Sequence, residues 1–133
     1  MASVATLIGR LLLALIFIIS GISKIGAYGT TVMYMESRGI PAAPFFLYAA
    51  VLVELGGGLC LASGFRARLA ALVLFAFLIP TTYLFHFRPA FDAAMNLIDR
   101  PQLISTLKNL SIMGGLLLVY GNGAGKFTIG KDA

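Results

Sequence analysis

Charged residues, cysteine, histidine and tryptophan are all scarce in this sequence. Only 11% of its 133 residues are Asp, Glu, Lys or Arg, and 59% are hydrophobic, whereas a soluble domain has roughly 25% charged residues. A soluble domain of this length buries about two-thirds of its unfolded surface and must cover its outside with polar residues. The mean hydropathy of +0.95 therefore indicates that a lipid bilayer surrounds most of this chain.

The single cysteine, Cys60, and the single histidine, His86, exclude several kinds of site within this chain. One cysteine cannot form an intramolecular disulfide or hold an iron–sulfur cluster, and one histidine cannot provide both ligands of a transmembrane haem. No metal site is expected. The net charge of +5 comes from dispersed basic residues, so we expect it to set membrane topology and predict no nucleic-acid partner.

Four apolar segments are long enough to span a membrane, each span needing about 20 mostly apolar residues. They predict an all-α integral membrane protein, a four-transmembrane-helix bundle that forms one domain over residues 1–133. Asp99 is a suitable N-cap and Pro101 suits a first helical turn, whereas Pro80 predicts a kink. The first segment is not expected to be a cleaved signal peptide, because no basic residue precedes Arg10. The predicted helices cover residues 5–24, 44–64, 68–87 and 100–121.

Short segments connect these helices. Ala27 to Pro41 mixes aromatic, Met and charged residues, which predicts an interfacial stretch with a short helix, and we expect His86 to Ile98 to be similar. The tight connection Gly64 to Arg68 predicts an antiparallel hairpin of the second and third helices. Gly121 to Lys126 is interpreted as a helix stop followed by a flexible segment.

Four spans place both termini on one side of the membrane, but the basic residues do not say which side. Five lie on each side: Arg10, Arg66, Arg68, Lys126 and Lys131 on the terminal side, and Lys24, Arg38, Arg88, Arg100 and Lys108 on the other. We predict cytoplasmic termini, on the argument that Lys24 and Lys108 are occupied inside the bundle while Arg66 and Arg68 have no neighbouring acid.

Glu54 is the most informative residue because it lies near mid-membrane, where an unpaired carboxylate costs several kcal/mol. At about 1.5 Å per residue, Glu54 and Lys108 lie roughly 14 Å and 12 Å from the non-terminal side, which predicts an ion pair. Lys24 and His86 end their spans on that side, and Arg10 shares a helix face with Lys24. The candidate polar cavity, for a ligand or a proton, comprises Lys24, Glu54, His86, Lys108 and Asn109. The alternative is that these residues only lock helix register.

Several glycines lie at spacings that favour close helix contact. We expect a packing role for Gly21, Gly57, Gly58, Gly64, Gly114 and Gly115.

A series of motifs resembles the DoxX family, in particular its small bacterial inner-membrane members of the YphA and YqjF type. The resemblance covers nearly the whole chain, although Arg88 to Gln102 fits less clearly. It implies a multi-pass protein of the bacterial cytoplasmic membrane. The motifs are Gly21-Ile-Ser-Lys24, Gly39-Ile-Pro41, Glu54-Leu-Gly-Gly-Gly, Gly64-Phe-Arg-Ala-Arg68, His86 and Lys108-Asn109-Leu-Ser-Ile-Met-Gly-Gly115.

The resemblance also suggests a function, because some relatives are described as membrane subunits of quinone-linked oxidoreductases or as partners in oxidative-stress complexes. The leading hypothesis is a membrane subunit or partner of such a redox or thiol-stress system, which binds a quinone or another small apolar ligand while redox protein partners hold any metal centre. The alternatives are a small-molecule or proton transporter or permeability protein, and a non-catalytic membrane assembly or lipid-interacting module. A homo-oligomer is the alternative to redox protein partners. The sequence leaves open whether the protein is an enzyme.

Overall fold

The structure is a computed structural model that describes residues 2–129; Lys131, used above to count charges, lies outside them. Four of its helical segments are long and apolar enough to cross a membrane, at residues 3–26, 43–63, 67–90 and 100–122. Each lies within three residues of its predicted range. The elements are α1 (Ala2–Gly26), α2 (Tyr28–Ser37), α3 (Ala43–Ser63), α4 (Ala67–Thr82), the π-helical turn η1 (Tyr83–Phe87), α5 (Arg88–Ala90) and α6 (Arg100–Asn122).

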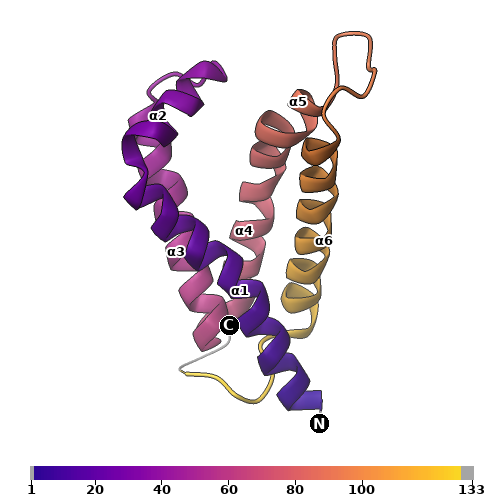
Figure 1. Ribbon diagram of the computed structural model, residues 1–133. Helices are drawn as coiled ribbons and strands as arrows, with labels where there is room; N and C mark the ends of the chain where they lie inside the picture. Colours follow the sequence, from indigo (N-terminus) through magenta and orange to yellow (C-terminus); the bar gives the residue numbers. More distant parts are fainter. Residues whose placement is uncertain (1, 130–133) are drawn as a thin grey trace.

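The spanning helices converge at the end of the molecule where α1 begins and α6 ends, and they diverge at the other end (Figure 1). α1 packs along α3, and α4 packs between α3 and α6, whereas no Cα atoms of α3 and α6 approach within 8 Å of each other in residues 2–129. α2 extends from α1 and covers the first turns of α3, where the Tyr28 and Tyr48 ring centroids lie 5.8 Å apart. The predicted interfacial helix is therefore α2.

Two glycines set the close antiparallel contact of α1 with α3. A Cβ atom on Gly21 would lie 2.7 Å from Leu55 Cγ, and one on Gly58 would lie 2.8 Å from Ile18 Cγ1. This register places Lys24 level with the turn of α3 that carries Glu54. A buried core that includes Phe17, Leu61, Leu74 and Leu116 holds the converging ends of the helices together.

The other glycines predicted to pack behave differently from one another. A Cβ on Gly57 would lie 2.8 Å from Leu74 Cγ, and one on Gly115 would touch Leu13. Gly64 ends α3 with a φ of 85°, a conformation that suits glycine, and Thr128 covers it. Among the residues that the structure describes, nothing lies within 4 Å of the position that a Cβ on Gly114 would occupy.

Gly58→Ala is expected to lower the free energy of unfolding by about 1–3 kcal/mol, the usual cost of overpacking. The new methyl group would lie 3.3 Å from the backbone nitrogen of Ile18 as well as against its side chain, and a backbone atom cannot rotate away. Unfolding in mixed detergent would measure the change. Gly56→Ala is the matched control, because its Cβ would meet nothing within 4 Å and its stability should be unchanged or slightly raised. Equal losses in both variants would contradict the α1–α3 contact.

The connection from α4 to α6 is only partly as predicted. α4 continues through Pro80 into η1, and α5 adds one turn before the chain forms a loop closed by a bridge between Phe91 and Leu97. The Asp92 carboxylate accepts hydrogen bonds from the backbone N–H groups of Asn96 and Ala94, which hold its pKa below the usual value. The predicted interfacial segment is thus a π-helical turn and a structured loop.

The predicted cap of the fourth span is confirmed, because the Asp99 side chain accepts a hydrogen bond from the backbone N–H of Gln102 at 3.1 Å. Pro101 occupies the first turn of α6, where backbone N–H groups have no partner within the helix, so its missing N–H costs no hydrogen bond.

Arg10 closes the converging end of the bundle. Its side chain is 2% exposed, and its guanidinium donates to the carbonyl oxygens of Ala62, Ala124 and Phe127. Residues 123–129 therefore lie across this end, contrary to the prediction of a flexible segment. The backbone N–H of Ile129 adds a hydrogen bond of 2.7 Å to the Ser63 carbonyl. Arg10 thus turns into the bundle on the helix face that it shares with Lys24.

Candidate functional site

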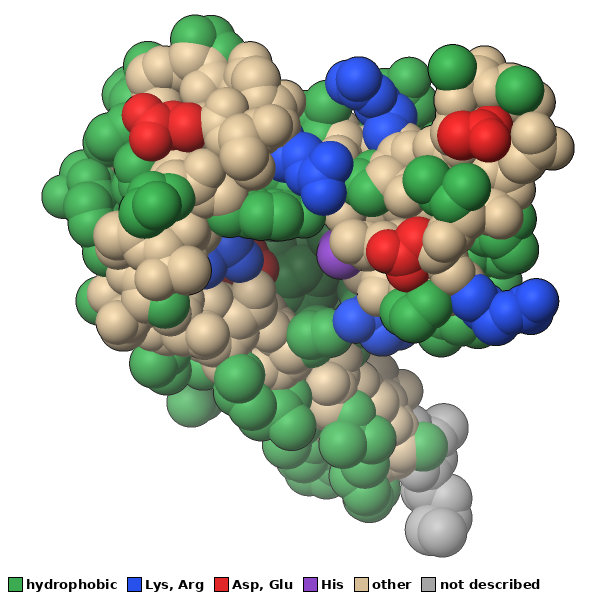
Figure 2. All heavy atoms as spheres, turned by 45° about the horizontal axis from the view of Figure 1, so that its top comes forward, with side chains coloured by type: hydrophobic (Ala, Val, Ile, Leu, Met, Phe, Trp, Pro, Cys, Tyr) green, Lys and Arg blue, Asp and Glu red, His purple; other side chains and the backbone are tan. Residues whose placement is uncertain are grey.

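A cavity of about 730 Å³ lies between the diverging halves of the bundle. Figure 2, which views the molecule from the diverging end, shows the hollow with Lys or Arg side chains and the histidine around it. The walls are largely apolar and aromatic, as in most small-molecule sites. Its apolar lining includes Ile40, Phe46, Val53, Phe77, Pro80, Leu84 and Phe85, and its polar lining includes Lys24, Thr31, Tyr34, Arg38, Thr81, His86 and Arg88.

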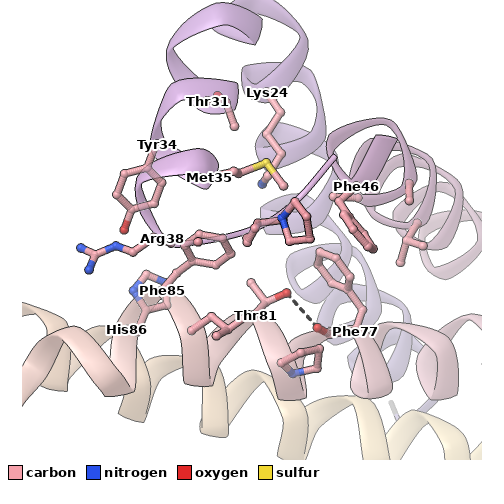
Figure 3. A pocket seen from close by; sticks show the side chains of 18 of the residues that line it. Lys24, Thr31, Tyr34, Met35, Arg38, Phe46, Phe77, Thr81, Phe85 and His86 are labelled. Atoms are coloured by element: carbon pink, nitrogen blue, oxygen red, sulfur yellow. Dashed lines mark hydrogen bonds between the residues drawn. The ribbon is translucent and has the colours of Figure 1, made fainter. Parts of the chain in front are cut away.

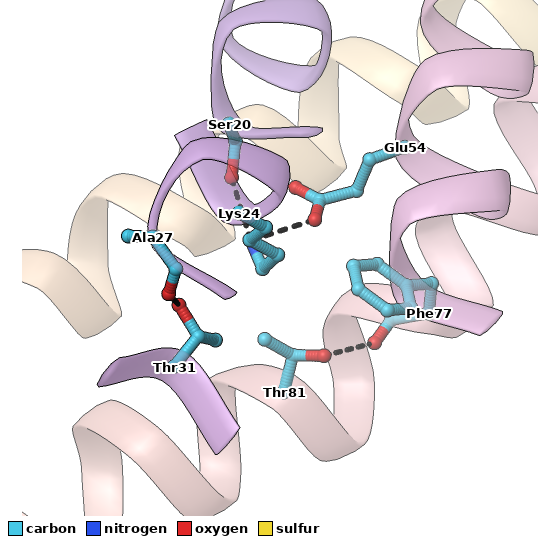
Figure 4. Close-up of polar contacts among 7 residues, drawn as sticks. All are labelled: Ser20, Lys24, Ala27, Thr31, Glu54, Phe77 and Thr81. Atoms are coloured by element: carbon cyan, nitrogen blue, oxygen red, sulfur yellow. Dashed lines mark hydrogen bonds and ion pairs between the residues drawn. The ribbon is translucent and has the colours of Figure 1, made fainter. Parts of the chain in front are cut away.

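The cavity ends at an ion pair between α1 and α3. Lys24 Nζ lies 2.7 Å from Glu54 Oε1 and donates a hydrogen bond to Ser20 Oγ at 2.8 Å. Figure 4 shows the Lys24 and Glu54 side chains directed at each other, with Thr31 and Thr81 nearby. The Glu54 side chain is 6% exposed and that of Lys24 is 27% exposed. Lys24 therefore neutralises a buried carboxylate while part of its own side chain still faces the cavity.

The predicted ion pair between Glu54 and Lys108 was wrong. Lys108 is exposed on α6, and no Cα atom of α6 lies within 8 Å of a Cα atom of α3 among the described residues. Depth does not determine which helices are neighbours. Because the glycine contacts bring α1 against α3, Lys24 is the lysine that reaches the acid.

His86 lines the cavity from the opposite wall, on η1 (Figure 3). Its Nδ1 lies 2.7 Å from the amide oxygen of Gln102, at the start of α6. An amide oxygen can only accept, so Nδ1 carries the proton in this contact. The neutral ring then has its lone pair on Nε2, which is able to accept a proton or a hydrogen bond. A π-helical turn is itself frequent at functional sites.

Asn109 is buried but does not line the cavity. Its side-chain amide donates to Thr82 Oγ1 at 3.1 Å and thereby joins α6 to α4. Its place supports a register-locking role, the alternative left open by the sequence. Of the five candidate residues, Lys24 and His86 line the cavity, Glu54 pairs with Lys24, and Lys108 and Asn109 lie apart from it.

Sequence reasoning missed the cavity residues that α2 contributes. Tyr34 and Arg38 were noted only as members of an interfacial stretch, and Arg38 also as one of the counted basic residues, yet both line the cavity. Arg38 lies over the Tyr34 ring at 5.3 Å, and that ring stacks on Phe85 at 5.4 Å. A signal was present in the aromatic and basic residues at helical spacing, but it did not show which way the helix turns.

Comparisons with known proteins agree with this architecture. The DoxX family model matches residues 5–87, from α1 to the end of η1. The chain belongs to the DoxX family. Lys24, Glu54 and His86 all lie within the matched part, whereas the loop that was found to fit less clearly follows it.

Two DoxX-type relatives extend the similarity over 96% of this chain. Inner membrane protein YqjF of Escherichia coli strain K12 is 36% identical over 128 residues, which cover 91% of the relative. Inner membrane protein YphA of the same strain is 30% identical over 128 residues and is covered to 89%. No solved structure matches this chain. With four membrane-spanning helices, this is a multi-pass inner-membrane protein.

Proposed function

We propose that this protein is the membrane component of a quinone-linked redox system and binds a quinone-class ligand in the cavity between α2, α3, α4 and η1. The observation that carries the proposal is the pairing of apolar and aromatic walls with polar groups on two sides, Lys24 with Glu54 on one and His86 on the other. A quinone has the matching chemistry, because its ring and chain are apolar and its two carbonyl oxygens accept hydrogen bonds.

The polar residues have distinct roles in this proposal. The Lys24 ammonium donates to a quinone oxygen, and His86 Nε2 exchanges a proton with the other oxygen, while Gln102 fixes the imidazole tautomer. Reduction of a quinone to a quinol consumes two electrons and two protons. The chain supplies routes for protons, and the electrons come from a redox protein partner.

The closed end of the bundle favours ligand binding over conduction. Arg10 ties α1 to α3 and to the segment after α6, at the end opposite to the diverging helices. An open pore needs a path to that end as well, whereas a site for a bound ligand does not. The cavity is therefore assigned to a bound ligand.

A purified sample should contain or bind quinone if the proposal holds. The experiment extracts the protein in a mild detergent, analyses bound quinone, and titrates a short-chain quinone into wild type, Glu54→Gln and Ala50→Phe. Ala50 lines the cavity, so a phenyl group there should block binding without removing a charge. Both variants are expected to lose binding, and Lys108→Gln to keep it. Absence of quinone binding by folded wild type, together with absence of a redox partner in the native complex, would overturn the proposal.

We propose in addition that both termini are cytoplasmic, so that the cavity opens toward the periplasmic side. Arg66 and Arg68 support this orientation because they lie in the short turn between α3 and α4, which contains no acid. This orientation assumes that Lys24 and Lys108 are occupied inside the bundle. Lys24 is indeed paired with Glu54, whereas Lys108 is exposed and does not support the orientation. A C-terminal green fluorescent protein fusion is expected to fluoresce and an alkaline phosphatase fusion to be inactive; the reverse pattern would contradict this orientation.

A further inference from the structure

A second, smaller cavity adjoins the mouth of the first. It has a volume of about 190 Å³ and is lined by Ser37, Arg38, Leu84, Arg88 and Pro89. Arg38, Leu84 and Arg88 also line the large cavity. The two spaces therefore adjoin and share part of their lining at the two arginines. A molecule held at the small cavity would lie at the entrance of the large one.

The two arginines reach this space from separate elements. Arg38 is the C-cap of α2, and Arg88 is the first residue of α5. Within residues 2–129, the ion pair found at N···O distances up to 4.0 Å is that of Lys24 with Glu54. In this part of the chain, therefore, neither the Arg38 nor the Arg88 guanidinium is paired with a carboxylate. The Ser37 hydroxyl donates to the Tyr34 carbonyl at 2.6 Å, so it does not compete as a donor. The lining of the small cavity thus contains two guanidinium groups and no acidic side chain.

This arrangement fits an anion with several oxygens. A guanidinium binds phosphate through two parallel hydrogen bonds, and it is more weakly hydrated than a lysine ammonium. The ring of Tyr34 lies under the Arg38 guanidinium at 5.3 Å and restricts its orientation. Arg88 ends the membrane-spanning segment of residues 67–90, which places the pair near the level of lipid headgroups.

We propose that Arg38 and Arg88 together bind the phosphate group of a phosphate-bearing amphiphile, whose apolar chain lies against the entrance of the large cavity. The shared chemistry is phosphate, and the adjoining apolar cavity favours a membrane phospholipid over a soluble phosphate. The site requires no redox activity. It therefore stands independently of the ligand proposed for the large cavity.

Lipid binding to the purified protein in a neutral detergent tests this site by native mass spectrometry. Phosphatidylglycerol is compared with diacylglycerol, which has the same chains and lacks the phosphate. The double variant Arg38→Gln with Arg88→Gln is expected to bind phosphatidylglycerol on the order of tenfold less tightly, because it loses charge-assisted hydrogen bonds. The control, Arg66→Gln with Arg68→Gln, removes the same charge at the opposite end of the bundle and is expected to bind as wild type does.

Three results would overturn the proposal in different parts. Equal phosphatidylglycerol binding by the Arg38/Arg88 variant and wild type, with folding confirmed by circular dichroism, would exclude the site. If both double variants lose the same amount of phosphatidylglycerol binding, the loss reflects the lower net charge of the protein and not a site at Arg38 and Arg88. A third result is that inorganic phosphate displaces the lipid and, by itself, protects wild type but not the Arg38/Arg88 variant from thermal unfolding. The ligand of the site would then be a soluble phosphate compound and not a lipid.

Discussion

Lys24→Met is expected to lower the free energy of unfolding by about 3–5 kcal/mol, the usual result of removing one partner from a buried ion pair. The Glu54 carboxylate, 6% exposed and 2.7 Å from Lys24 Nζ, would be left without its cation in a bilayer that cannot solvate it. Unfolding of the detergent-solubilised protein measures the loss. Lys108→Met is the matched control, because Lys108 is exposed on α6, and it should leave stability unchanged within about 0.5 kcal/mol. A similar loss in both variants would contradict the assigned pair.

The double variant Lys24→Met with Glu54→Met separates a structural role of the pair from a functional one. Two apolar side chains of similar volume often restore the stability that a single substitution removes. If the pair only locks α1 against α3, this variant should behave as wild type does in every assay. If the pair serves a ligand, stability should return while quinone binding does not.

Arg10→Met is the second change with a large expected effect, a loss on the order of 3 kcal/mol. Arg10 is 2% exposed and donates to three backbone carbonyl groups, and buried acceptors that lose a charged donor carry a desolvation cost of about 1–3 kcal/mol each. The segment after α6 should also separate from the bundle. Limited proteolysis from the C-terminus, together with mixed-detergent unfolding, measures both effects.

Arg68→Met is the control for Arg10→Met, because Arg68 is exposed at the same end of the bundle. It should change neither stability nor the rate of proteolysis. An Arg10→Met protein whose tail is as resistant as that of wild type would contradict the role of Arg10 in closing this end. Quinone binding should persist in Arg10→Met protein that remains folded, since Arg10 does not line the cavity.

The helices could be predicted from the sequence because length and hydropathy determine a membrane span almost by themselves. Asp99 and Pro101 marked the start of α6 through local backbone chemistry, which depends only on neighbouring residues. The π-helical form of η1 could not be predicted, because it depends on how residues 83–87 pack against α5 and α6.

The partner of Glu54 could not be predicted from the same information. Depth along a helix is a one-dimensional quantity, and it favoured Lys108 over Lys24, which ends its predicted span. The choice between them depends on which helix faces α3, and that follows from Gly21 and Gly58, whose Cβ positions would collide with Leu55 and Ile18. The packing role of these glycines was predicted from their spacing, but the spacing did not indicate which residues they would contact.

The cavity itself results from the divergence of the helices, which no segment encodes alone. Two of its polar residues, Lys24 and His86, were predicted as site residues because ionisable groups at the ends of spans are informative. Arg38 and Arg88 were considered only as members of interfacial stretches and in the count of basic residues. Their common position at the cavity mouth depends on α2 and α5 approaching each other in three dimensions.

Photo-crosslinking with an azido-quinone, followed by peptide mass spectrometry, tests the central claim most directly, because it locates the ligand without assuming an activity. Label is expected on cavity residues such as Met35, Phe46 and Phe85, to be displaced by excess unlabelled quinone, and to be absent from Ala50→Phe. Label confined to lipid-facing residues such as Leu12 and Leu118, which are exposed, or insensitive to the competitor, would contradict a quinone site in the cavity.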